Sequence, residues 1–183
     1  MNLAYNYNRG GRIYLSSDII YIILKENDAL TLAQDYIEDT LADDEISLLN
    51  LYKIEQHLKA YEIKNNKLYY DNGHKEVTFP IRLDVKDKFQ RSKADEIVKT
   101  LDYYENSYEI RLNYDYTHPR IIFCLSTELS SYIMTFGFTK LRSRRNINLE
   151  SDQTNLAAEE TDRIHREINF DNFKVKWLGG DFE

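Results

Sequence analysis

The chain of 183 residues has few of the residues on which small, loop-rich proteins depend. It contains one cysteine, two prolines and six glycines. A single cysteine excludes an intrachain disulfide and is typical of a reducing compartment. The scarcity of proline and glycine indicates long regular elements. A chain of this length can bury roughly 70% of its unfolded surface, so it needs neither a disulfide nor a metal for stability.

Long apolar runs are also missing. The longest run near the N-terminus, residues 19–24, is too short to span a bilayer and lacks the flanks of a signal peptide. We therefore expect no membrane partner and a cytoplasmic location, which becomes the host cytoplasm if a phage encodes the chain.

Several motifs that bind ligands or carry out catalysis are absent. The chain has no P-loop and no G-x-G-x-x-G, and its acidic run lacks the central glycine of an EF-hand. Cys124 lies inside an apolar run, which is typical of a small core residue rather than a nucleophile. No zinc-ligand spacing such as H-x₃-H occurs among the four histidines, which are His57, His74, His118 and His165. We expect no resident cofactor.

Charge is distributed unevenly along the chain. The net charge is −7, but residues 26–52 hold eight acids and no lysine, arginine or histidine, so the remainder is nearly neutral. Fifteen tyrosines accompany a single tryptophan. Tyrosine is prominent in protein interfaces, although an AT-rich genome would produce the same bias.

Hydrophobic periodicity predicts an α+β fold. Apolar residues recur at helical spacing in residues 17–25, 28–41, 44–61, 92–104, 126–137 and 156–167. Alternating or continuous apolar runs predict strands at residues 12–15, 61–64, 67–71, 75–86, 108–115, 120–125 and 173–177. Asn65 and Asn66 lie between the second and third of these strands, where they would form a turn. Either Asp43 or Asp44 would cap the third predicted helix, and Ser126 would cap the fifth. We expect N-terminal helices, a central antiparallel sheet of about five strands with packed helices, and an irregular C-terminal appendage.

The division into domains follows from the weaker pattern after Phe138. We expect residues 1–138 to form a single α+β domain. Residues 139–183 would form an appendage of a basic loop, an exposed helix and a short strand, docked on the same domain.

The acidic segment is the first candidate site. Its carboxylates would either form a solvated helix face or imitate a phosphate backbone and bind a protein with a basic surface. The candidate partner-binding residues are Asp35, Glu38, Asp39, Asp43, Asp44 and Glu45. A helix-turn-helix that binds DNA is excluded here, because its recognition helix would begin with Asp-Asp-Glu and repel phosphates.

A basic cluster follows the predicted central helix and is the second candidate. It consists of Lys140, Arg142, Arg144 and Arg145. Such a cluster is either a solvated loop or a contact for phosphates or an acidic partner. A second copy of this chain would supply that acidic partner, so a homo-oligomer is compatible with the sequence.

The third candidate is the segment from Ile81 to Lys86. On a strand, Asp84 and Lys86 share one face, where Asp-x-Lys is often only an exposed ion pair. The surrounding order of helix, three-stranded meander, helix and strand resembles the PD-(D/E)xK nuclease core. The resemblance implies that Asp71 and Asp84 bind Mg²⁺ while Lys86 stabilises charge at the phosphate. The chain departs from that pattern because no proline precedes Asp71 and Pro80 interrupts the third strand.

A second resemblance covers residues 120–138. This stretch resembles the strand–LSxxL–helix–GF segment of some minor capsid proteins of polinton-like viruses, with the Gly-Phe one turn later. It implies a virion structural or assembly protein.

Three hypotheses for the function remain. The leading one is a non-enzymatic protein-binding module with an acidic, Tyr-rich surface. Such a module could inhibit a host nucleic-acid enzyme, in the manner of anti-CRISPR or anti-restriction proteins of phages and mobile elements. The alternatives are a Mg²⁺-dependent nuclease acting on RNA or DNA, and a virion protein.

Overall fold

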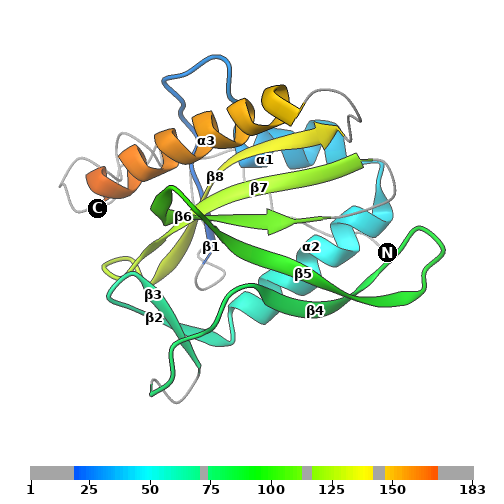
Figure 1. The fold of residues 1–183 in the computed structure, drawn as a ribbon, viewed down its shortest axis with the longest axis horizontal. Helices are drawn as coiled ribbons and strands as arrows, with labels where there is room; N and C mark the ends of the chain where they lie inside the picture. Colours follow the sequence, from blue (N-terminus) through cyan, green and yellow to red (C-terminus); the bar gives the residue numbers. More distant parts are fainter. Residues whose placement is uncertain (1–18, 71–73, 113–116, 142–146, 169–183) are drawn as a thin grey trace, which may run out of the picture.

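The computed structural model describes residues 19–70, 74–112, 117–141 and 147–168, which form a mixed sheet with helices on both faces (Figure 1). The sheet has the strand order β1-β8-β7-β6-β5-β4, and β2 and β3 form a separate hairpin. The strands are β1 (Ile19–Tyr21), β2 (Tyr61–Lys64), β3 (Lys67–Tyr70), β4 (Ile81–Lys86), β5 (Ser92–Leu101), β6 (Tyr104–Arg111), β7 (Thr117–Ser126) and β8 (Ser131–Leu141).

The predicted α+β class is confirmed, but the predicted sheet is corrected in two respects. The main sheet has six strands rather than five. It is mixed rather than antiparallel, because β1 runs parallel to β8 while the pairs from β8 to β4 are antiparallel. A parallel edge strand needs a long connection, and here α1 and the elements that follow it provide that connection.

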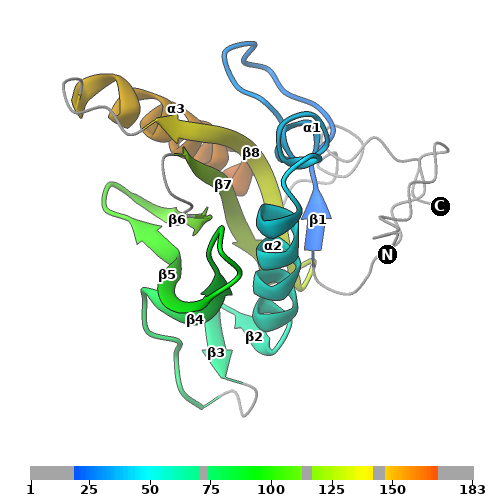
Figure 2. The same cartoon turned by 90° about the vertical axis from the view of Figure 1, so that its right-hand side faces the viewer.

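The helices divide between the two faces of the curled sheet (Figure 2). The short α1 (Ala33–Tyr36) continues as the π-helical η1 (Ile37–Leu41), and α2 (Glu45–Leu58) follows. These elements cover the concave face, where Leu51, Ile54 and Leu58 of α2 are fully buried in one core with strand residues such as Ile110 and Phe123.

The opposite, outer face carries α3 (Ile147–Glu167) and a second core. Ala157, Ala158 and Ile164 are fully buried against β7 and β8. A buried polar contact also joins the two layers, because the hydroxyls of Thr135 and Thr161 lie 2.7 Å apart. The C-terminal helix therefore packs on the sheet, while the predicted division near residue 138 stays a prediction.

The helix predicted for residues 126–137 is wrong. A four-residue turn leads into β8, whose residues 131–138 are all buried because both faces of this strand are covered. Ser126 makes the bond that suggested a helix cap, since its hydroxyl accepts from the Leu129 N–H at 3.1 Å, but it closes a turn. The strand–helix arrangement in the resemblance to capsid proteins is therefore absent from residues 117–141.

The helix predicted for residues 92–104 is also wrong, and a β-bulge explains the error. Ile81 pairs with Val98 and Arg82 with Glu96, so Ile97 is the extra residue of the bulge. Ile97 and Val98 are both buried in the same core, which breaks strict alternation and produces an apparent helical spacing. The helix predicted for residues 17–25 fails as well, since Ile19 to Tyr21 form β1.

Two local predictions are confirmed. Asp44 is the N-cap of α2, and its carboxylate accepts from the Ser47 N–H at 3.0 Å. Asn65 and Asn66 both have positive φ and form the turn between β2 and β3. The predicted strands at residues 12–15 and 173–177 lie outside the described residues.

Candidate functional surfaces

The acidic surface lies where η1 ends and α2 begins. We define it by six carboxylates: Asp35, Glu38, Asp39, Asp43, Asp44 and Glu45. All are exposed except Asp44, which is half-buried because it caps α2. The set extends from α1 and η1, which carry Asp35, Glu38 and Asp39, to the connection that holds Asp43 and Asp44 and to Glu45 at the start of α2.

The structure shows no cation paired with these carboxylates among the residues that it describes. None of the six forms an ion pair with a residue that the structure describes. The Asp44 carboxylate accepts from the N–H and the hydroxyl of Ser47, and Glu38 accepts a 3.3 Å hydrogen bond from the Gln34 amide. Within the described residues, the charge of this surface is left for solvent or for a partner.

Tyrosine contributes less to this surface than expected. Of the two tyrosines in residues 26–52, Tyr36 is buried against Gly137 and bonds to the Thr139 hydroxyl at 2.6 Å. Tyr52 is 46% exposed on α2, beside Leu49 at 50%. The exposed part of α2 is therefore acidic at its start and apolar one to two turns further on.

The candidate nuclease residues lie only partly within the described chain. Asp84 is exposed and Lys86 half-buried on β4, and both point away from the core that holds Val85, as the alternation predicted. The Lys86 ammonium donates to the Ser92 hydroxyl at 3.1 Å. Asp71 lies outside the described residues. Within those residues, no group of three or more histidine, cysteine or acidic side chains is placed to hold a metal ion.

The basic cluster is described at one position. Lys140 is half-buried on β8, opposite His118 of β7. Arg142, Arg144 and Arg145 lie outside the described residues, so the role of the cluster stays a prediction.

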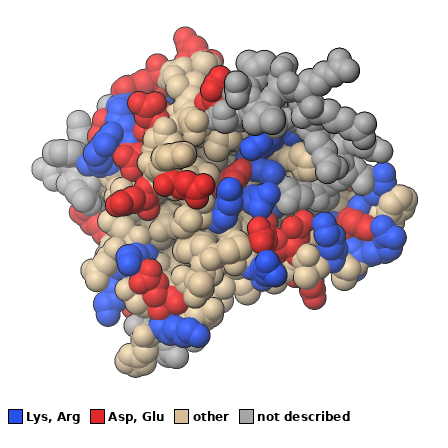
Figure 3. Space-filling view, in the orientation of Figure 1, with Lys and Arg blue, Asp and Glu red and all other residues tan. Residues whose placement is uncertain are grey.

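The outer face of the sheet carries a row of ion pairs that we did not predict. Figure 3 shows acidic and basic side chains intermingled on this side of the molecule. The Glu96 carboxylate lies 2.9 Å from Arg82 and 3.3 Å from Arg111, and joins three adjacent strands. The alternation that places Glu109 and Arg111 on one side of β6 indicates a polar strand face. It does not indicate which cations lie opposite that face.

The ion pair between Glu109 and Arg120 is almost completely buried. The two side chains are 4% and 5% exposed, and Arg120 Nε lies 2.6 Å from Glu109 Oε1. The two groups form an ion pair but no hydrogen bond at Arg120 Nε, because no acceptor lies at hydrogen-bond angles to this atom. Burial lowers the pKa of Arg120, and the neighbouring Glu109 carboxylate counteracts this effect.

One further acid is buried beside a tyrosine hydroxyl. Glu55 of α2 is 8% exposed and accepts a 2.6 Å hydrogen bond from the Tyr21 hydroxyl. Burial raises the pKa of its carboxyl, while the hydrogen bond from Tyr21 opposes the rise. A single tyrosine–glutamate pair does not by itself define a catalytic site.

No protein-family model, curated protein or solved structure matches this chain. None of the helices in the described ranges combines the length and apolar character that crossing a membrane requires.

Proposed function

We propose that this protein is a non-enzymatic binding module whose acidic surface docks on a basic protein partner. The observation that carries the proposal is the set of six carboxylates at residues 35–45, which have no ion pair to any residue that the structure describes. A partner that handles nucleic acids fits best, because its groove binds phosphates and would accept carboxylates at similar spacing. Inhibition of such an enzyme is the proposed outcome.

The physical basis is long-range attraction. Carboxylates that are exposed and have no ion pair in the described chain can meet a cationic partner without the loss of an existing pair. Complementary charge accelerates encounter, and salt screens it over roughly 8 Å at physiological ionic strength. Binding should therefore weaken steeply as salt increases.

Affinity capture from a host lysate at low and high salt tests this proposal. The variant Asp39→Asn, Asp43→Asn, Asp44→Asn removes three charges and keeps an N-cap, since asparagine caps helices well. We expect its partner binding to fall at least tenfold at low salt. The matched control is Glu62→Gln, Asp102→Asn, Glu105→Gln, which makes the same charge change at exposed positions elsewhere. Equal losses in both variants, or no loss in either, would refute a localised acidic site.

A Mg²⁺-dependent nuclease is the second candidate. The observation that favours it is the shared orientation of Asp84 and Lys86 on β4. The hypothesis needs Asp71 as well, and requires RNA or DNA cleavage that depends on Mg²⁺ and stops with EDTA. Cleavage that survives in a folded Asp84→Ala variant would exclude this site. The virion alternative predicts instead that the purified chain assembles into particles.

A further inference from the structure

The turn between β4 and β5 presents an exposed aromatic ring on an ordered loop. We call residues 87–91 the basic turn. The Asp87 carboxylate accepts from the N–H groups of Phe89 and Arg91 at 2.8 and 2.9 Å, and from the Arg91 guanidinium at 2.8 Å. These bonds fix the loop, yet Phe89 remains 64% exposed. The ring is held in water by a defined structure.

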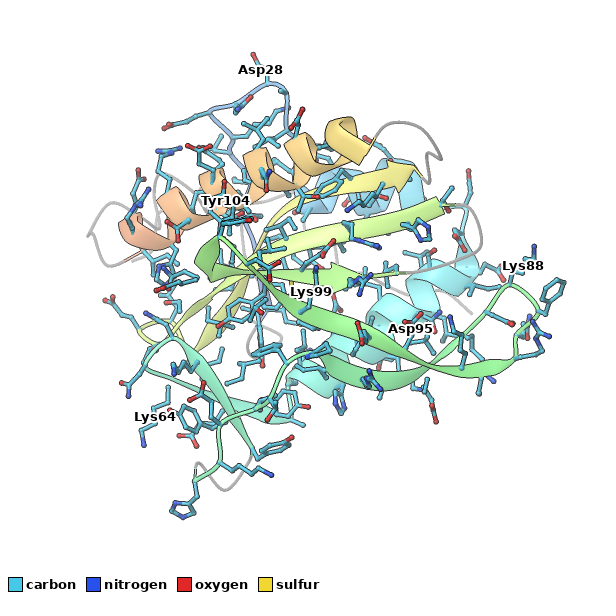
Figure 4. All side chains as sticks on the ribbon, in the orientation of Figure 1. Asp28, Lys64, Lys88, Asp95, Lys99 and Tyr104 are labelled. Carbon is cyan, nitrogen blue, oxygen red and sulfur yellow. The ribbon has the colours of Figure 1, made fainter. Side chains whose placement is uncertain are left out.

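Two cations accompany this ring. The Lys88 ammonium and the Arg91 guanidinium carbon each lie 4.9 Å from the centre of Phe89. In Figure 4, Lys88 marks the end of the hairpin, where it projects beyond the sheet. The tip therefore offers an apolar ring together with positive charge.

The basic turn lies beside α2. The Asn50 amide donates to the Lys86 carbonyl at 2.7 Å and accepts from the Lys86 N–H at 2.9 Å. The Lys53 ammonium donates to the Asp84 carbonyl. These contacts attach the edge strand to the helix, and Figure 2 shows the β4–β5 turn next to α2.

The exposed side of α2 has complementary properties. Glu45, Leu49 and Tyr52 follow one another at intervals of four and three residues, so they form one ridge, which we call the α2 ridge. Leu49, Tyr52 and Phe89 are three of the seven large apolar side chains exposed in the described chain. Their occurrence at one end of the molecule is typical of a protein interface.

We propose that the chain forms a two-fold symmetric homodimer in which the basic turn of each copy docks on the α2 ridge of the other. Phe89 contacts Leu49 and Tyr52, and Lys88 faces Glu45. A two-fold axis requires that both halves of the contact lie on one self-complementary surface, and the adjacency of turn and ridge satisfies this requirement. The inference goes beyond the proposed function, since it concerns the purified chain alone.

A second copy explains more than nucleic acid would. A single strand could stack a base on Phe89 and place phosphates on Lys88 and Arg91. It would not account for Leu49 and Tyr52, and the carboxylates at the start of α2 would repel its phosphates. A protein surface with both signs of charge and an apolar centre satisfies all of these groups.

Sedimentation equilibrium of the purified chain over a wide concentration range, at low and high salt, tests the proposal. We expect a monomer–dimer equilibrium, with a dissociation constant about tenfold or more higher for Phe89→Ala, as for a central aromatic anchor. Tyr103→Ala is the matched control, because Tyr103 is 88% exposed on the β5–β6 turn. This control should change the dissociation constant by less than about twofold.

A charge exchange gives an independent test. Lys88→Glu and Glu45→Lys should each weaken self-association, because each places like charges together at both contacts of the dimer. An equimolar mixture of the two variants restores both attractive pairs and should dimerise about as well as the original chain. Rescue in the mixture also shows that each variant retains its fold. Circular dichroism of each variant alone checks this before mixing.

Several outcomes would overturn the proposal. These are a monomer at all concentrations, a dimer unaffected by Phe89→Ala, or a mixture without rescue. Open-ended assemblies would exclude the two-fold arrangement. The purified chain could instead be a monomer that binds a labelled single-stranded oligonucleotide. If Phe89→Ala abolishes that binding, the basic turn is a nucleic-acid site and not a dimer contact. None of these results depends on whether a basic partner binds the acidic surface.

Discussion

Acidic side chains occur in two regions of this molecule with opposite surroundings. On the outer face of the sheet, Glu96 and Glu109 each contact arginines from neighbouring strands. On the acidic surface at residues 35–45, no carboxylate has a cation within ion-pair distance in the described chain. The carboxylates of the sheet link neighbouring strands. The carboxylates of the acidic surface contribute charge and, apart from Asp44, do not link parts of the fold.

This difference distinguishes charges that stabilise the fold from charges that are available for binding. A paired and buried carboxylate is costly to alter, because its arginine remains in a medium that penalises an isolated charge. An exposed carboxylate without a partner costs the fold little, so its presence needs another reason, and binding is the one we propose. Substitutions in the two regions should therefore differ in their effect on folding.

The largest effect is expected for Glu109→Gln. This change leaves Arg120 nearly fully buried without a counter-charge, and we expect a loss of about 3–5 kcal/mol in unfolding free energy. Urea denaturation at pH 7 measures it. Glu105→Gln makes the same change at an exposed position of the same strand and should cost less than about 0.5 kcal/mol. Similar values for the two variants would mean that the buried pair does not support the sheet.

An intermediate effect is expected for Asp44→Ala, the one member of the acidic surface with a folding role. Loss of its bond to the Ser47 N–H should cost about 1 kcal/mol of unfolding free energy. Asp44→Asn retains a capping oxygen and should cost much less. Equal destabilisation by both substitutions would show that the charge, and not the cap, stabilises α2.

Prediction from the sequence succeeded where local chemistry decides the structure. The Asp44 cap and the Asn65–Asn66 turn depend on bonds and dihedral angles within a few residues. It failed where both faces of a strand are buried or a bulge interrupts it, as in β8 and at Ile97. Continuous apolar runs then carry no alternation, and helical spacing arises by coincidence.

The same distinction between local and non-local features applies to the candidate surfaces. Exposure of the acidic residues and the shared face of Asp84 and Lys86 follow from composition and alternation. The pairing of Glu109 with Arg120 and the attachment of β4 to α2 through Asn50 depend on sheet register and tertiary contacts. Such non-local contacts leave no mark in a single sequence.

A smaller, pH-dependent effect distinguishes Glu55, which is buried like Glu109 but accepts a hydrogen bond from the Tyr21 hydroxyl. Because burial raises the pKa of its carboxyl above the ordinary 4.5, the folded state binds the proton more tightly. Its stabilising contribution is fully present below pH 4.5 and is lost as the pH rises through the folded pKa. Glu55→Gln should remove this loss, so that the urea midpoint of the variant falls less as the pH rises above 4.5. An unchanged slope would show that Glu55 is not the group that titrates.

The smallest effect on folding is expected for the triple variant Asp39→Asn, Asp43→Asn, Asp44→Asn. Asp39 and Asp43 are exposed and have no ion pair in the described chain, and asparagine preserves the cap at residue 44. We expect its unfolding free energy to lie within about 0.5 kcal/mol of the original value. Thermal and urea unfolding beside the capture experiment would then separate binding from folding. If this variant loses several kcal/mol instead, the acidic residues stabilise the fold, and the contrast between the two regions disappears.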